Sequence, residues 1–241
     1  MRRSSYVLAV FFVALPLFAQ QTPAVPTEPW PIVPAATPEV YWQKLMLGNA
    51  KYVAGTLTYT GIAARRTETA TDPVGDPPIG GQKPPVTVLS CSDSRVPDEL
   101  VFGRTVGDLF VVRVAGNVAG QFDIASIEYA ISKKWTKLIV VMGHEKCGAV
   151  EAALDPADPG TPSLVALVQR IRESFVGWQT WPDTGRVERA VKANARSSAA
   201  YLLAHSTVIR GAVLDPRPDH RVGLVVAYYK LGSGEVEVVQ P

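Results

Sequence analysis

The chain has very little cysteine and histidine, with only two cysteines and three histidines in 241 residues. Two cysteines close at most one disulfide, so the sequence is not that of a disulfide-stapled scaffold. Its 47% hydrophobic and 19% charged residues are enough for a full core, and the length suits one α/β domain. Both cysteines, Cys91 and Cys147, directly follow or lie just beyond apolar runs. These two places are therefore the first candidates for a functional site.

An excess of charge of one sign is also missing. The formal net charge is only +2, and no basic run is interleaved with aromatic residues. The electrostatic pattern of a DNA- or RNA-binding protein is therefore absent, and we expect no nucleic-acid partner. The sequence also shows no internal repeat and no phosphate-binding loop.

No apolar run is long enough to span a bilayer comfortably, because the longest covers only residues 6–18. It follows Met1-Arg2-Arg3 and precedes Ala19-Gln20, the order of regions in a signal peptide. We expect a signal peptide at 1–19, a Pro-rich arm at 20–37 and one folded domain at 38–241. The mature protein is then periplasmic or secreted, without stable membrane insertion. A signal anchor is the alternative, since Leu17 replaces the small residue preferred near a cleavage site.

The order of predicted elements indicates an α/β fold. Short apolar runs predict buried strands at residues 86–89, 108–114 and 138–143. Apolar residues at helical spacing predict helices at 38–54, 124–132, 164–175 and 186–205, and the Pro/Gly-rich residues 63–85 are assigned to loop. Residues 222–229 and 235–239 flank a Gly-Ser-Gly turn and predict a hairpin. We predict a mostly parallel sheet of four to five strands flanked by helices, with an antiparallel C-terminal edge strand.

Two polar motifs follow two of these strands. Residues 91–95 read Cys-Ser-Asp-Ser-Arg, and residues 143–148 read Gly-His-Glu-Lys-Cys-Gly. Open α/β sheets bind their ligands at the carboxyl ends of strands. Cys91, His144 and Cys147 offer two thiolates and one imidazole, a set used by catalytic zinc when a fourth position stays open. The sequence therefore predicts a Zn²⁺ site with these three ligands.

Asp93 and Arg95 are the charged neighbours of the first ligand. Asp93 lies two residues beyond Cys91 and is able to accept a hydrogen bond from water at the metal, while Arg95 is able to keep Asp93 ionised through a bidentate pair. We predict that both are catalytic residues. A disulfide between Cys91 and Cys147 is the alternative to a metal site, but it explains neither His144 nor Asp93 and Arg95. For Asp93 and Arg95 themselves, the alternative is a solvated surface pair.

These motifs are similar to those of the β-class carbonic anhydrases. The resemblance rests on residues 91–95, 115–117, 126–130 and 143–148, and it extends from about residue 38 to residues 229–236. It implies an enzyme that uses zinc to hydrate carbon dioxide reversibly to bicarbonate and a proton. It also implies that Asp93, once released from Arg95, is able to become a fourth zinc ligand in an inactive form.

The resemblance assigns four further residues to substrate binding. Gln82 matches a donor to a substrate oxygen, Phe110 and Tyr129 match an apolar pocket, and Gly148 leaves room beside the metal. For Phe110 and Tyr129, a role in the core is the alternative. Because part of this family's pocket comes from a neighbouring subunit, the resemblance also implies a homodimer or a dimer of dimers.

Two other functions use the same ligand set. A zinc-binding protein without turnover is one, but Asp93, Arg95 and Gln82 argue against it because storage needs none of them. A related zinc enzyme acting on a small carbon–sulfur substrate, such as carbon disulfide, is the other, and the sequence leaves it open.

The leader generates the first testable prediction. Mass spectrometry of the native protein should show an N-terminus close to Gln20, because the apolar run ends just before Ala19. An intact start at Met1 or Arg2 in the cytoplasmic fraction would contradict export.

Overall fold

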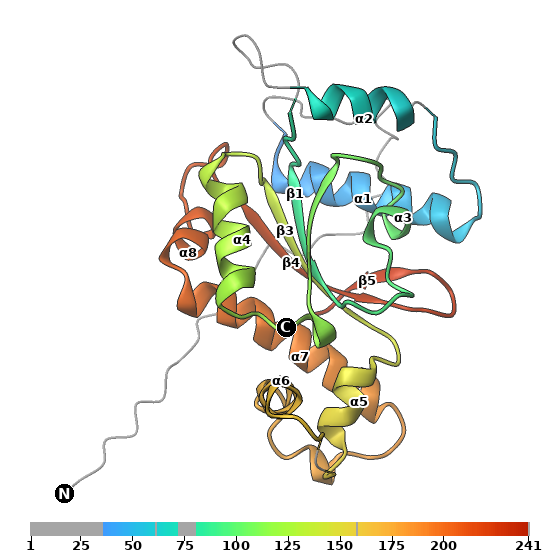
Figure 1. Ribbon diagram of the computed structural model, residues 1–241, viewed down its shortest axis with the longest axis vertical. Helices are drawn as coiled ribbons and strands as arrows, with labels where there is room; N and C mark the ends of the chain where they lie inside the picture. The colour runs from blue at the N-terminus through green and yellow to red at the C-terminus, as the bar shows by residue number, and fades with distance from the viewer. Residues whose placement is uncertain (1–35, 61, 72–80, 158, 241) are drawn as a thin grey trace, which may run out of the picture.

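A computed structural model describes residues 36–60, 62–71, 81–157 and 159–240, and it shows a twisted sheet with helices on both faces (Figure 1). The predicted signal peptide and nearly all of the predicted arm lie outside the described residues. Within the described part of the chain, no helix combines the length and the apolar character needed to cross a membrane.

The sheet has five strands in the order β2-β1-β3-β4-β5. Their bounds are β1 Val86–Ser90, β2 Leu109–Arg113, β3 Leu138–His144, β4 Gly223–Tyr229 and β5 Val236–Val238. The first four strands in this order pair in parallel and β5 pairs antiparallel to β4. Every residue of β1 and β3 is buried, as expected for central strands covered on both faces. The predicted fold class is confirmed.

The helices divide between the two faces of this sheet. On one face, α1 (Pro38–Val53) packs its aromatic residues against alternate side chains of the central strands; this cluster includes Tyr41, Trp42, Leu45, Val86, Val88, Leu138, Val140 and Met142. On the other face, α4 (Gln121–Ser132), α7 (Arg186–His205) and α8 (Thr207–Val213) cover the intervening side chains; this cluster includes Leu89, Ile127, Ile139, Val141, Leu202 and Ile209. The alternation of a strand's side chains between faces thus creates both cores.

A third apolar cluster lies beyond the carboxyl ends of the strands, where α5 (Gly148–Leu154) and α6 (Pro162–Arg172) pack beside α7 (Figure 1). It contains both cysteines together with Val150, Val168, Ile171 and Phe175. Of the apolar residues whose spacing predicted a helix at 164–175, Val168, Ile171 and Phe175 are buried, although α6 ends at Arg172 and Phe175 lies beyond it. Leu164 stands in the first turn of α6 and is 46% exposed.

Asn49 connects α1 to distant parts of the chain. Its Nδ2 donates to the carbonyl oxygens of Val101 and Gly234 at 3.0 and 2.8 Å, and its Oδ1 accepts from the backbone N–H of Val236 at 3.0 Å. Asn49 is buried, so these bonds satisfy backbone groups that water does not reach. They fix α1 to the short helix α3 (Asp98–Val101) and to the β4–β5 hairpin.

The loop predicted at residues 63–85 was wrong for its first part, which forms α2 (Ile62–Ala70). Residues 72–80 lie outside the described residues. Ala63, Ala64 and Arg65 favour a helix, but α2 has no buried residue and so lacks the apolar stripe on which the prediction relied. Arg65 ties it to the body of the protein through an ion pair with Asp108 at 3.1 Å.

The contact between α1 and the end of α3 generates the second prediction. A Cβ atom at Gly48 would lie 1.8 Å from the carbonyl oxygen of Phe102, so Gly48→Ala should destabilise the protein by about 2 kcal/mol or more. The control is Gly211→Ala in α8, where a Cβ meets nothing within 4 Å. Alanine there should be neutral or stabilise by up to about 1 kcal/mol. Urea unfolding measures the free energy of unfolding of both variants. If both changes stabilise the protein, Gly48 does not pack closely against the carbonyl oxygen of Phe102.

Candidate metal centre

The first predicted ligand stands where β1 ends. β1 is paired in parallel with β2 on one side and with β3 on the other, so its direction is fixed from both sides. Cys91 is the first residue after the strand and is buried. Its thiol sulfur accepts a hydrogen bond from the backbone N–H of Gly116 at 3.2 Å.

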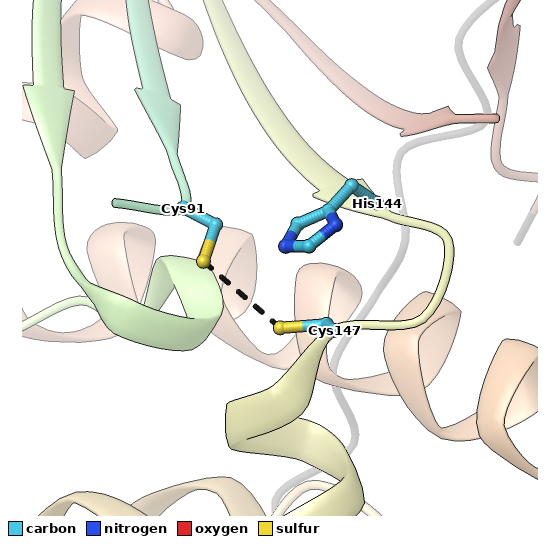
Figure 2. A group of neighbouring side chains, drawn as sticks. All are labelled: Cys91, His144 and Cys147. Carbon is cyan, nitrogen blue, oxygen red and sulfur yellow. Dashed lines mark hydrogen bonds between the residues drawn. The ribbon is translucent and has the colours of Figure 1, made fainter. Parts of the chain in front are cut away.

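The other two ligands come from the end of the neighbouring strand. His144 is the last residue of β3, and Cys147 lies at the start of α5 after a tight turn in which Lys146 has a φ of 50°. Figure 2 shows the three side chains pointing toward one another. Their ligand atoms all lie within 4.8 Å of one another, and all three residues are buried. The structure therefore brings the predicted set together.

The two cysteines are free thiols in this structure. Their sulfur atoms are 4.0 Å apart, about twice the length of a disulfide bond. The Cys147 thiol, hydrogen-bonded to the sulfur of Cys91, lowers the pKa of Cys91 to about 4. The same bond, together with burial, raises the pKa of Cys147. The two buried thiols are therefore hydrogen-bonded to each other where a metal cation would hold two thiolates.

His144 has the ring orientation that a metal ligand needs. Its Nδ1 lies 2.9 Å from the carbonyl oxygen of Glu145, and because a carbonyl only accepts, Nδ1 carries the proton. The other nitrogen, Nε2, is buried and has no hydrogen-bond partner among the residues that the structure describes. Burying an unprotonated ring nitrogen without a hydrogen bond or a metal ion destabilises the fold. Together with the two sulfur atoms, this nitrogen forms a ligand set that suits a Zn²⁺ ion.

Asp93 and Arg95 form the predicted bidentate pair beside this cluster. Arg95 Nε donates to Asp93 Oδ1 at 2.9 Å and its Nη2 donates to Oδ2 at 2.7 Å. These bonds hold the pKa of Asp93 well below its usual range, so the carboxylate stays ionised at neutral pH. Asp93 Oδ2 lies 3.8 Å from His144 Nε2, and Arg95 Nη2 also donates to the carbonyl oxygen of Lys146 at 3.1 Å. The pair therefore connects the two ligand-bearing loops.

The four residues assigned to substrate binding separate into two groups. Gly148 follows Cys147, and a Cβ on it would meet nothing within 4 Å, so this glycine leaves space on the metal side of the sheet. Gln82 is exposed and precedes β1, and Phe110 pairs with Thr87 near the beginning of that strand. Four residues of parallel strand, about 13 Å, separate Thr87 from Cys91.

Tyr129 belongs with Phe110, since their ring centroids are 6.4 Å apart. Tyr129 is 46% exposed, which does not fit the alternative of a core residue. Within one chain, Gln82, Phe110 and Tyr129 therefore lie near the amino-terminal ends of the strands. The three ligands lie at the opposite, carboxyl-terminal ends.

Two polar contacts to the site were missed from the sequence. Gly116 was noted only as part of a similar motif, although its N–H bonds the sulfur of Cys91. Asn194 of α7 is buried and donates from Nδ2 to the carbonyl oxygen of Gly116 at 2.6 Å. A buried asparagine on the sheet-facing stripe of a predicted helix was the available signal.

The fold and the ligand set define an α/β protein with a cluster of two cysteines and one histidine at the ends of parallel strands. A family model described as carbonic anhydrase matches residues 86–236. A carbonic anhydrase of Mycolicibacterium smegmatis is 32% identical over 86% of this chain and 95% of its own length. Carbonic anhydrase 2 of Mycobacterium tuberculosis is 34% identical over 73% of this chain and 83% of its own.

Solved structures agree with these relatives. The β-carbonic anhydrase CafA of Aspergillus fumigatus superposes with a TM-score of 0.58 at 28% identity, over 67% of this chain and 79% of its own. A structure from a study of two tetrameric β-carbonic anhydrases of Sordaria macrospora superposes with a TM-score of 0.62 at 23% identity, over 84% of this chain and 98% of its own. At this identity the match shows similarity of the fold alone. The chain belongs to the β-class carbonic anhydrase family, as its motifs predicted, and is an enzyme of that family.

The ligand geometry generates the third prediction. The purified protein should contain one zinc per chain, and Cys147→Ser should lose it on dialysis against a chelator, because two soft ligands become one. Ser92→Ala is the matched control, since Ser92 is an exposed neighbour of Cys91. Elemental analysis by mass spectrometry measures the metal. Equal zinc retention by Cys147→Ser, or a Cys91–Cys147 disulfide in fresh protein, would disprove the assignment.

Proposed function

We propose that this protein binds one Zn²⁺ through Cys91, His144 and Cys147 and catalyses the reversible hydration of carbon dioxide to bicarbonate and a proton. The observation that carries the proposal is the buried Nε2 of His144, which faces two thiols and has no hydrogen-bond partner in the described part of the chain. The carboxylate of Asp93 lies 3.8 Å away. Bound zinc would supply the Lewis acidity that makes water a nucleophile near neutral pH.

The side chains around the metal position the reacting water. Asp93 is ionised and accepts a hydrogen bond, so it is able to orient the O–H of the attacking water and direct a lone pair toward carbon. Arg95 keeps Asp93 ionised and fixes its plane by two hydrogen bonds. The open side of Gly148 leaves room for a small linear substrate. Bicarbonate then leaves by exchange with water, and the proton passes to buffer.

We further propose that the working form is a homodimer or a dimer of dimers. Gln82, Phe110 and Tyr129 lie toward the far edge of the sheet from their own chain's ligands, so a second copy has to supply them to the pocket. Phe122 of α4 is 82% exposed close to Tyr129 in the sequence, which supports a covered surface on this helix. The Sordaria relatives are described as tetrameric.

The sequence features of residues 1–19 support export, and we propose a periplasmic or secreted location. Zinc held by thiolates is compatible with such a compartment, because thiolates bound to the metal are not available to form a disulfide.

A stopped-flow assay of carbon dioxide hydration on the mature protein tests the function. Zinc content measured on the same sample makes the result interpretable, since hydration should increase in proportion to zinc. A zinc-loaded protein that does not accelerate hydration would refute the proposal.

Variants of the Asp–Arg pair generate the fourth prediction. Asp93→Ala and Arg95→Ala should each lower kcat/KM about a hundredfold, because the water loses its orientation. The double variant should lose little more than either single one, since the two residues act as a unit.

The chain offers a matched control for this pair. Arg217 binds Asp215 with the same spacing, through Nε to Oδ1 at 2.9 Å and Nη2 to Oδ2 at 2.6 Å, on an exposed turn. Arg217→Ala should leave hydration unchanged. Additive losses at Asp93 and Arg95 would show that the two residues have separate roles.

A further inference from the structure

Asp98 is a buried carboxyl group that the proposed reaction does not use. It is the first residue of α3, seven positions after Cys91, and its side chain is fully buried. The hydroxyl of Ser90, the residue before Cys91, donates to Asp98 Oδ2 at 2.7 Å. The other oxygen, Oδ1, has no hydrogen-bond partner among the described residues.

Arg113 lies between this carboxyl group and the first metal-binding loop. It is the last residue of β2 and pairs in register with Ser90. Its Nε donates to the carbonyl oxygen of Cys91 at 3.0 Å, and its Nη2 donates to the carbonyl oxygen of Asp93 at 2.6 Å. Asp98 Oδ2 lies 3.9 Å from the same Nε and is the one carboxylate paired with Arg113 in the described part of the chain. One guanidinium thus contacts the buried acid and two loop carbonyls.

Burial of the ionised Asp98 carboxylate lowers the free energy of unfolding. Desolvation raises its pKa to about 7, against weaker opposing effects of Ser90 and Arg113, and nearby Glu99 adds to the increase. Because the folded-state pKa is raised, Asp98 stabilises the fold at acidic pH, and this contribution is lost as pH rises through 7. At pH 8 the ionised group is therefore a cost, and a carboxamide of the same shape should remove that cost.

We propose that Asp98 is a positioning residue whose carboxylate holds the Arg113 guanidinium against the carbonyl groups of Cys91 and Asp93. The position of Arg113 determines the conformation of this loop. The loop in turn determines where the sulfur of Cys91 and the carboxylate of Asp93 lie relative to His144. Such outer contacts orient the ligands of a metal site. The inference rests on the metal centre of the proposed function.

The test compares Asp98→Asn with Glu99→Gln, which removes an exposed carboxylate one position away. Co²⁺ affinity at pH 8 is measured by competition with a chelator, and binding is followed by the thiolate-to-cobalt absorption band. Urea unfolding of the metal-free proteins is measured in parallel. Asp98→Asn should bind Co²⁺ about tenfold more weakly, yet unfold at an equal or higher urea concentration. Glu99→Gln should match the wild type in both measurements.

A second variant tests the connection through Arg113. Arg113→Lys keeps the charge but loses the planar fork that reaches both carbonyls, so it should also weaken Co²⁺ binding. Adding Asp98→Asn to it should weaken binding little further, because both changes act on one unit. Additive losses would overturn the proposal.

The outcomes separate this inference from the function on which it rests. If Asp98→Asn binds Co²⁺ as tightly as the wild type, or if its weaker binding comes with an equal loss of stability, Asp98 does not position the loop. If the wild type itself binds neither Co²⁺ nor Zn²⁺, the metal centre fails, whatever Asp98 does.

Discussion

The parallel pairing of β1 with β3 is the constraint on which the rest of the site depends. Its register sets Leu89 opposite Val141, so the chain leaves β1 at Cys91 close to the level at which β3 ends with His144. Both strands are buried on both faces, and a shift in register would expose apolar side chains or bury polar ones. Hydrophobic packing of the sheet therefore fixes the distance between two ligands that are far apart in the sequence.

Around the ligands, the structure concentrates groups that are costly to bury and then connects them to one another. Two buried thiols are hydrogen-bonded to each other, His144 presents a nitrogen that has no hydrogen-bond partner among the described residues, and Asp93 is held ionised by Arg95. A divalent cation would offset the burial of both the thiols and the imidazole nitrogen, since it binds thiolates and a neutral imidazole. The side chains of the site thus already have the positions that metal binding requires. The contacts of Arg113 with the carbonyl groups of the Cys91 loop help to hold these positions.

The central strands and the ligand set were predictable because each has a strong local signal. Runs such as residues 138–143 have no polar residue, and Cys91 and Cys147 stand beside strand ends. The helix α2 was missed because it buries nothing, and Asp98 was missed because burial of a carboxyl after a turn leaves no periodic pattern. The strand predicted at 86–89 already separates Gln82 from Cys91, but the proximity of Phe110 and Tyr129 at the same end of the sheet required the assembled structure.

The most direct test of the metal centre is X-ray absorption at the zinc edge on the purified protein. We expect two sulfur neighbours at about 2.3 Å, from Cys91 and Cys147, and lighter neighbours at about 2.0 Å, one of them the nitrogen of His144. Zinc surrounded only by nitrogen and oxygen would contradict it, because the two thiolates would then not be its ligands.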